Sequence, residues 1–458
     1  MKKSLLTLPV LMFCGFASAF GAPYAVQVTS GNLWNETMGM MALGISNNGR
    51  YICGTTVTWE GFIYDRIEEK LITTAEISQS KIGDQGANEF YAVSNDGIAF
   101  GSDGNGGITL SMDGEYNVFE KVRDPYIYIT VKGVTADGSM AVGYVNPGYT
   151  DFRPCYWENG EIHILPYPTS EEVGFNIKDG ASAIGVSADG NIIIGHLENR
   201  AKTYPFIYWK RLADGSYEYV GAFEGNYEDS RDVDGNIKSA YTTGMPVIFQ
   251  PAAVSADGNK VAIYVQRVKN NQLSPWEVAV YDIPSDSYTP IDYDSDNLLY
   301  EDENNFFYIT GITSDGYMAG FTGYPTGPNT PFILVPGEYN DAKTLTQMFP
   351  GVELLEEYED FCLDYHPLYL LTGMSADGSV IAGYIEVFMD IDSTMPGFAT
   401  YFVETGLNSG NSEVGKVTPV EEGTPVYYTV DGISLRTPAK GLNIMRKPDG
   451  STSKIFVK

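Results

Sequence analysis

An acidic stretch of the chain places side-chain oxygens at the spacing of a calcium-binding loop. Residues 292–297 are Asp-Tyr-Asp-Ser-Asp-Asn, and Glu303 is the twelfth residue counted from the first aspartate. Carboxylates at positions one, three, five and twelve can wrap around a hard cation, although Asn297 stands where such loops have a glycine. The flanking sequence indicates strand and loop, and acidic loops of this kind are usually only solvated. The candidate ligands of a structural Ca²⁺, the one cofactor that the sequence suggests, are Asp292, Asp294, Asp296 and Glu303.

The sequence gives little support for catalysis, and we assign no catalytic residue. The three histidines, His163, His196 and His366, form no spaced metal or acid–base motif. A recurring Gly-x-Ser-x-x-Gly has one residue too many for a nucleophile elbow, and its serine precedes a hairpin instead of a helix. One alternative stays open: among 59 acidic residues, two carboxylates at the mouth of a channel could form a glycan-active or other hydrolase.

Aromatic residues in long irregular segments are the candidates for ligand binding. Such rings can stack on sugar rings or anchor a protein interface, with neighbouring Asp and Asn available for hydrogen bonds. The alternative is that tyrosine is abundant in this chain, with 33 residues, and that these rings cover the strands. The candidate ligand-binding residues are Tyr149, Tyr204, Tyr227, Tyr241, Tyr324 and Phe388.

A repeated turn organises the elements that must position these residues. Seven segments follow the pattern Ala/Gly-x-Ser/Thr-x-Asp/Asn-Gly, and each precedes a short apolar run that usually ends in glycine. Asp-Gly or Asn-Gly between two apolar runs predicts a β-hairpin, because the turn requires the positive φ that these residues adopt easily. The turns begin at Gly44, Ala92, Gly133, Gly185, Ala253, Gly311 and Gly373.

Each of the last five turns is followed by a variable loop and then by a proline that precedes an aromatic strand. In most units a fourth apolar segment comes after that strand. Four antiparallel strands repeated seven times predict an all-β fold, a seven-bladed β-propeller over residues 23–405, because a closed ring leaves only short protected edges. Antiparallel pairing puts the uniform Asp-Gly turns at one end of the blades. The long segments, including residues 266–275 and 321–330, then lie at the opposite end, which we call the long-loop face and expect to bind ligands.

The net charge and the N-terminal sequence limit the classes of molecule that this protein can bind and the place where it acts. With 28 basic and 59 acidic residues, the net charge is −31, which repels nucleic acids and anionic membranes. Residues 1–22 have two lysines, an apolar core and Ala-Ser-Ala, the pattern of a secretory signal peptide that is too short to span a bilayer. Cys14 leaves a lipoprotein signal as an alternative. We therefore expect a secreted or cell-surface protein.

The pattern of turn, apolar run, glycine, loop and aromatic strand resembles the HAF-type extracellular repeats and the WD40-like repeats of TolB-type β-propellers. A linker over residues 406–424 precedes residues 425–458, a short β segment that resembles the C-terminal sorting segments of exported Bacteroidetes proteins, although Asn443 stands where those have an aromatic residue. The resemblance implies an extracellular propeller without naming a ligand. The sequence predicts an exported recognition module that binds a glycan or an extracellular protein through the long-loop face; its oligomeric state is left open.

Overall fold

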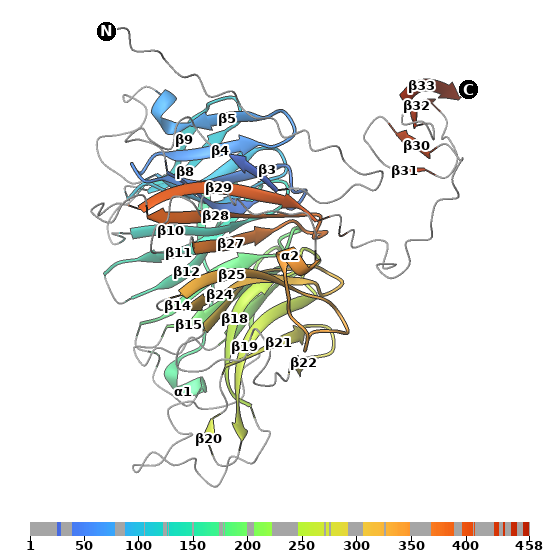
Figure 1. Ribbon diagram of the computed structural model, residues 1–458. Coiled ribbons are helices and arrows are strands. Elements are labelled where there is room, and N and C mark those ends of the chain that lie inside the picture. Colours follow the sequence, from blue (N-terminus) through green and yellow to red (C-terminus); the bar gives the residue numbers. More distant parts are fainter. Residues whose placement is uncertain are drawn as a thin grey trace. The chain divides into compact units, whose positions relative to one another are not determined.

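A ring of seven four-stranded antiparallel blades forms the body of the protein (Figure 1). This computed structural model describes residues 25–28, 39–77, 88–104, 106–121, 126, 128–148, 151–173, 177, 179–198, 206–221, 246–269, 272–273, 276–291, 306–324, 327–348, 368–388, 396–405, 407, 426–429, 434–435, 441–446 and 452–457. Within this part of the chain, helix is confined to α1 (Ser170–Val173), α2 (Leu345–Met348) and the 3-10 turn η1 (Thr74–Glu76). The predicted seven-bladed propeller is confirmed.

Consecutive strands pair in chain order within each blade. The first three blades consist of β2 (Met40–Ile45), β3 (Tyr51–Thr56), β4 (Gly61–Asp65) and β5 (Lys70–Thr73); β6 (Glu89–Val93), β7 (Ile98–Ser102), β8 (Gly106–Ser111) and β9 (Tyr116–Lys121); and β10 (Tyr128–Val134), β11 (Met140–Asn146), β12 (Arg153–Glu158) and β13 (Glu161–Ile164). The fourth consists of β14 (Ala181–Val186), β15 (Ile192–Leu197), β16 (Phe206–Arg211) and β17 (Tyr217–Gly221).

The fifth and sixth blades follow the same order. They consist of β18 (Pro246–Val254), β19 (Lys260–Lys269), β21 (Glu277–Asp282) and β22 (Ser287–Pro290), and of β23 (Phe306–Ile312), β24 (Met318–Tyr324), β25 (Gly327–Leu334) and β26 (Lys343–Thr344). Two segments that we expected to be irregular loops are instead partly strand. Strand β20 (Gln272–Leu273) pairs back onto β19, and β24 and β25 pair as far as Tyr324 and Gly327, so that Pro331 lies inside β25.

The seventh blade closes the ring with a strand from the start of the chain. Strands β27 (Leu368–Met374), β28 (Val380–Phe388) and β29 (Pro396–Glu404) are completed by β1 (Ala25–Val28), which pairs antiparallel with β29. In Figure 1 the orange β28 and β29 accordingly lie beside the blue strands of the first blade. The sequence pattern did not predict this exchange, because β1 lies far from the turn motif that marks the other blades.

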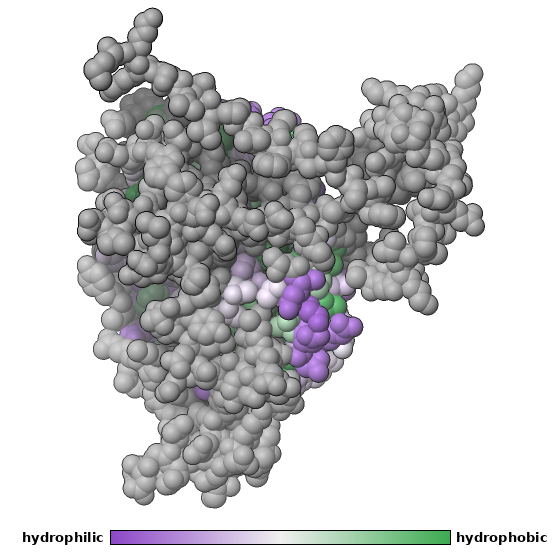
Figure 2. All heavy atoms as spheres, viewed as in Figure 1, coloured by the Kyte–Doolittle hydropathy of each residue, from purple (hydrophilic) through white to green (hydrophobic). Residues whose placement is uncertain are grey.

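Apolar side chains from neighbouring blades form the core. Each of seven buried clusters joins two consecutive blades, and one of them joins the first and seventh through residues such as Phe62 and Phe402. The aromatic third strands contribute large fully buried side chains, for example Trp209. Where described residues reach the face drawn in Figure 2, hydrophilic residues lie outermost and hydrophobic residues are visible between them.

Glycine recurs at the same position of the second strand because the backbones approach closely there. A Cβ at Gly143 would overlap the carbonyl oxygen of Thr130, and a Cβ at Gly195 would overlap that of Ser182. The same overlap with the first strand occurs at Gly54, Gly101, Gly320 and Gly383. The fifth blade has Ile263 at this position, paired with Pro251.

The chain divides into two compact units, Met1–Gly410 and Asn411–Lys458. The second unit contains one antiparallel sheet of β30 (Val426–Thr429), β31 (Ser434–Leu435), β32 (Gly441–Arg446) and β33 (Thr452–Val457), in the order β31-β30-β32-β33. The predicted C-terminal β segment is therefore present as a sheet. Its resemblance to a sorting segment stays a prediction.

Candidate functional site

Most of the residues that the sequence suggested for binding lie outside the described residues. These are Tyr149, Tyr204, Tyr227 and Tyr241, together with the proposed calcium ligands Asp292, Asp294, Asp296 and Glu303. Two others end second strands: Tyr324 pairs with Gly327 at the tip of β24, and Phe388 pairs with Pro396 at the tip of β28. Both tips are at the long-loop face. Among the described residues, no group of three or more His, Cys, Asp or Glu residues could hold a metal ion.

The repeated Ser-x-Asp-Gly residues are used by the turns themselves. In the fourth blade, Ser187 Oγ donates to Asp189 Oδ1 at 2.7 Å and accepts the Ile192 backbone N–H at 3.0 Å. Gly190 follows with φ of 76°, a conformation that glycine adopts without strain. The same hydroxyl-to-carboxylate bond recurs at Thr135, Ser255, Thr313 and Ser375. These polar groups therefore shape the Asp-Gly face instead of forming a reactive site.

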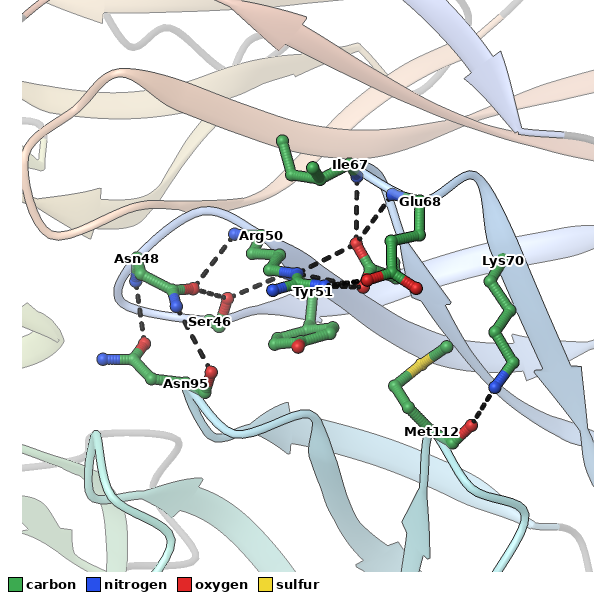
Figure 3. Close-up of polar contacts among 10 residues, drawn as sticks. Ser46, Asn48, Arg50, Tyr51, Ile67, Glu68, Lys70, Asn95 and Met112 are labelled. Carbon is green, nitrogen blue, oxygen red and sulfur yellow. Dashed lines mark hydrogen bonds and ion pairs between the residues drawn. The ribbon is translucent and has the colours of Figure 1, made fainter. Parts of the chain in front are cut away.

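Neighbouring turns are also bonded to each other around the ring. Asn95 donates its backbone N–H to Ala136, Ala136 to Ala188, and Ala188 to Ala256. Between the first two blades, the Asn48 backbone N–H donates to Asn95 Oδ1 at 2.8 Å, as the close-up shows (Figure 3). Beside this contact Arg50 lies over the ring of Tyr51 and pairs with Asp65. The Asp-Gly end is thus held by contacts that stabilise the ring.

A β-bulge interrupts the innermost strand of every blade. In each pairing of first and second strands the register shifts by one residue, just before the small residue of the turn motif. Bulges leave a residue outside the ladder and redirect its side chain. The extra residues are Leu43, Tyr91, Lys132, Ile184, Ala252, Thr310 and Thr372. Because they differ in chemistry while the surrounding turns are uniform, the bulges are positions where blades can acquire different functions.

The two bulged residues of the second and third blades meet at a cavity. Lys132 Nζ lies 4.3 Å from the centre of the Tyr91 ring, within the range of a cation–π interaction. The cavity has a volume of about 310 Å³, at the lower end of small-molecule sites. Its polar lining comes from first and second strands. Glu89, Ser102, Thr130 and Tyr144 lie in the strand halves remote from the Asp-Gly turns, and Tyr91 and Lys132 are the bulged residues directly before the turn motif. The cavity therefore reaches from the bulges toward the predicted long-loop end.

Glu89 organises the charges in this cavity. Tyr91 Oη donates a hydrogen bond to Glu89 Oε2 at 2.7 Å. Burial raises the pKa of the Tyr91 hydroxyl, and the bond to Glu89 and its charge raise it further. Burial lowers the pKa of the Lys132 ammonium, while the negative charge of Glu89 opposes this effect. The cavity thus contains the Tyr91 hydroxyl, the Glu89 carboxylate and the Lys132 ammonium. The negative charge of Glu89 balances the positive charge of Lys132.

A second polar cluster continues into the fourth blade. Glu198 Oε1 accepts a hydrogen bond from Ser182 Oγ at 2.6 Å and lies 2.9 Å from His196 Nε2. Ser182 donates to the glutamate and not to the histidine, so the three residues do not form a nucleophilic triad. Tyr144 interacts with residues of both clusters. Burial raises the pKa of its hydroxyl, hydrogen bonding with Thr130 of the cavity lowers it, and the negative charge of Glu198 in the second cluster raises it.

The end of the second strand of the third blade also presents an unsatisfied acceptor. Asn146, two residues beyond Tyr144, is only 4% exposed. Its Oδ1 has no hydrogen-bond partner, although buried polar atoms rarely lack one. Its backbone is paired with Tyr128, which precedes the cavity residues of β10. A hydroxyl-bearing ligand could satisfy such an acceptor.

The comparisons with known proteins find only distant structural similarity. No protein-family model matches the sequence, and no curated protein matches it. Similar solved structures include oligogalacturonate lyase from Vibrio parahaemolyticus (12% identity, 84% of this chain and 97% of that chain, TM-score 0.47). Streptogramin B lyase (11%, 84% and 99%, TM-score 0.42) and TolB from Acinetobacter baumannii (10%, 84% and 81%, TM-score 0.34) are also similar. At these identities nothing about activity follows, and the function must be argued from this chain's own residues.

Proposed function

We propose that this chain is an exported recognition module whose propeller binds a neutral glycan at the long-loop end, in the cavity between the second and third blades. The observation that supports it most is the polar lining of that cavity, with Glu89, Tyr91 and Lys132 in mutual contact or charge interaction. Carboxylate, phenol and ammonium groups are donors and acceptors suited to sugar hydroxyls. Export to the cell surface or medium is supported by the signal-like residues 1–22.

Charge selects the class of glycan. The net charge of −31 disfavours polyanionic polysaccharides at long range, and within the cavity the Lys132 ammonium is balanced by Glu89. Neutral sugars avoid this repulsion. Among the described residues that line the cavity, Glu89 is the only one with a carboxylate, whereas glycoside hydrolysis usually needs two. Binding is therefore favoured over the alternative of a hydrolase.

The test is a glycan array followed by calorimetry on the variants Lys132→Met and Tyr91→Phe. Loss of the ammonium or of the phenol bond to Glu89 should weaken binding of an array-positive neutral glycan about tenfold, the effect of one hydrogen bond to a charged group. The matched control is Glu115→Gln, an exposed residue in the hairpin after β8, on the Asp-Gly face.

Two results would contradict the proposal. One is an array on which no neutral glycan binds while a protein partner is retained by the same face. The other is turnover of the bound glycan in a parallel hydrolysis assay, which would establish the enzyme alternative.

A further inference from the structure

Trp59 is an exposed aromatic residue in a strained turn at the long-loop end of the first blade. It lies between β3 and β4, and 53% of its surface is exposed. Its φ is 62°. A left-handed conformation is unfavourable for a non-glycine residue and is unusual for a bulky side chain. Neither burial nor backbone preference therefore explains a tryptophan here.

The other non-glycine residues with positive φ show that this case is distinct. Glu69, Asn159 and Asp286 are the remaining ones among the described residues. All three are polar and lie in hairpins between third and fourth strands, at the Asp-Gly face. Trp59 has the same unfavourable backbone conformation, but its side chain is large and apolar and it lies at the opposite face, the long-loop face. Strained residues of this kind occur disproportionately at binding sites.

The turn that contains Trp59 is joined to the edge of the cavity. The Asn88 backbone N–H donates to the carbonyl oxygen of Trp59 at 2.9 Å, and Asn88 immediately precedes Glu89 of the cavity. On the other side, Tyr128 immediately precedes Ile129 and Thr130 of the cavity and is 42% exposed. The backbone of Trp59 is thus hydrogen-bonded to the residue before Glu89, and Tyr128 directly precedes Ile129 on the other side of the cavity.

We infer that Trp59 and Tyr128 are stacking platforms that extend the cavity into an elongated site for a neutral oligosaccharide. The inference rests on the proposed function and specifies that the ligand is a chain of several sugars rather than a single one. Flat aromatic faces suit the C–H faces of sugar rings, and their rigid side chains lose little entropy on binding. The cavity holds one sugar by its hydroxyls, and each platform holds a neighbouring ring by stacking.

The experiment compares length series of neutral gluco-, manno- and galacto-oligosaccharides, from monomer to hexamer, by calorimetry and tryptophan fluorescence. Wild-type affinity should rise with length. Trp59→Asn should lower the affinity for the longer oligomers about tenfold and leave monomer binding unchanged. Tyr128→Ala should act in the same way, and Trp59→Phe should restore part of the loss. The control is Ile67→Ala, which removes a 60% exposed apolar residue of the same blade at the opposite face.

Stability separates a binding role from a structural one. Asparagine tolerates positive φ better than tryptophan, so Trp59→Asn should melt at or above the wild-type temperature. A lower melting temperature with unchanged length dependence would overturn the inference. Its failure is distinguishable from failure of the proposed function: Lys132→Met should weaken binding at every length, and wild-type affinity that does not rise with length would overturn only the role of the platforms. Absence of binding at all lengths would overturn both.

Discussion

Backbone and hydroxyl groups stabilise the ionised form of Asp137, the aspartate of the turn in the third blade. At Asp137, the backbone N–H of Ser139 donates at 3.0 Å, and the hydroxyl of Thr135 donates at 2.8 Å. These bonds lower the pKa of the Asp137 carboxyl, the backbone bond having the largest effect. Because the folded pKa lies below the unfolded value, this stabilisation is complete above the unfolded pKa, about 4, and is lost as pH falls through the folded pKa.

Acidification should therefore destabilise the propeller through the turn that contains Asp137. Asp137→Asn should lower the melting temperature by about 1 °C at neutral pH and leave it unchanged at pH values below the folded pKa, where the carboxyl is protonated in both states. Thermal melting followed by circular dichroism across acidic and neutral pH measures the effect. The matched control is Asp96→Asn, because the equivalent Asp96 accepts no hydrogen bond from its Ser94 hydroxyl. An equal effect of the two substitutions would contradict this explanation.

At the scale of the element, a bulged first strand pairs in every blade except the fifth with a second strand that contains a glycine. The sequence predicts the glycines but not their cause, which is the overlap that a Cβ would make with the opposite carbonyl. It also predicts the hairpins around Gly49 and Gly190, since positive φ has a clear residue signature. The bulges have none, because one extra residue leaves the alternating pattern of the short strand nearly unchanged.

The glycine of the second strand can be tested directly. Gly195→Ala should destabilise the protein by about 3 kcal/mol, because the new methyl group overlaps the Ser182 carbonyl oxygen and the Trp209 ring. Gly148→Ala is the matched control, since a Cβ there meets no atom within 4 Å. Chemical denaturation measures both. Equal stability of the two variants would show that the strands can separate without cost.

The candidate site shows where reasoning from sequence ends. Tyr91 and Lys132 are 41 positions apart and come from blades whose turn motifs give no sign that their first strands meet. Trp59 lies in the first unit, where no pattern indicated a strained turn. Strand parity alone determines which strand ends lie together at the long-loop face, and ligand binding at that face stays a prediction. Which side chains meet there depends on contacts between blades, which no local pattern contains.

At the scale of the whole molecule, stability depends on closure of the ring by β1. Removal of residues 25–28 should lower the melting temperature by several degrees, because the edge of β29 then loses its partner strand. Removal of residues 411–458 is the control, and it should leave the main transition unchanged because they form a separate compact unit. Calorimetry distinguishes the two. A main transition that shifts only on loss of the C-terminal unit would contradict the assigned role of β1.

The pairing of β1 with β29 also sets an order of events during folding. The first of these strands leaves the ribosome long before the second, so β1 must wait until six blades and most of the seventh have been made. Joining such distant segments carries a large loop-closure cost and is slow. We expect β1 and β29 to gain protection last in pulse-labelled hydrogen exchange, and early protection would contradict this order. Until then the unfinished ring has an open strand edge, so closure is the step at which the nascent chain is most exposed to aggregation.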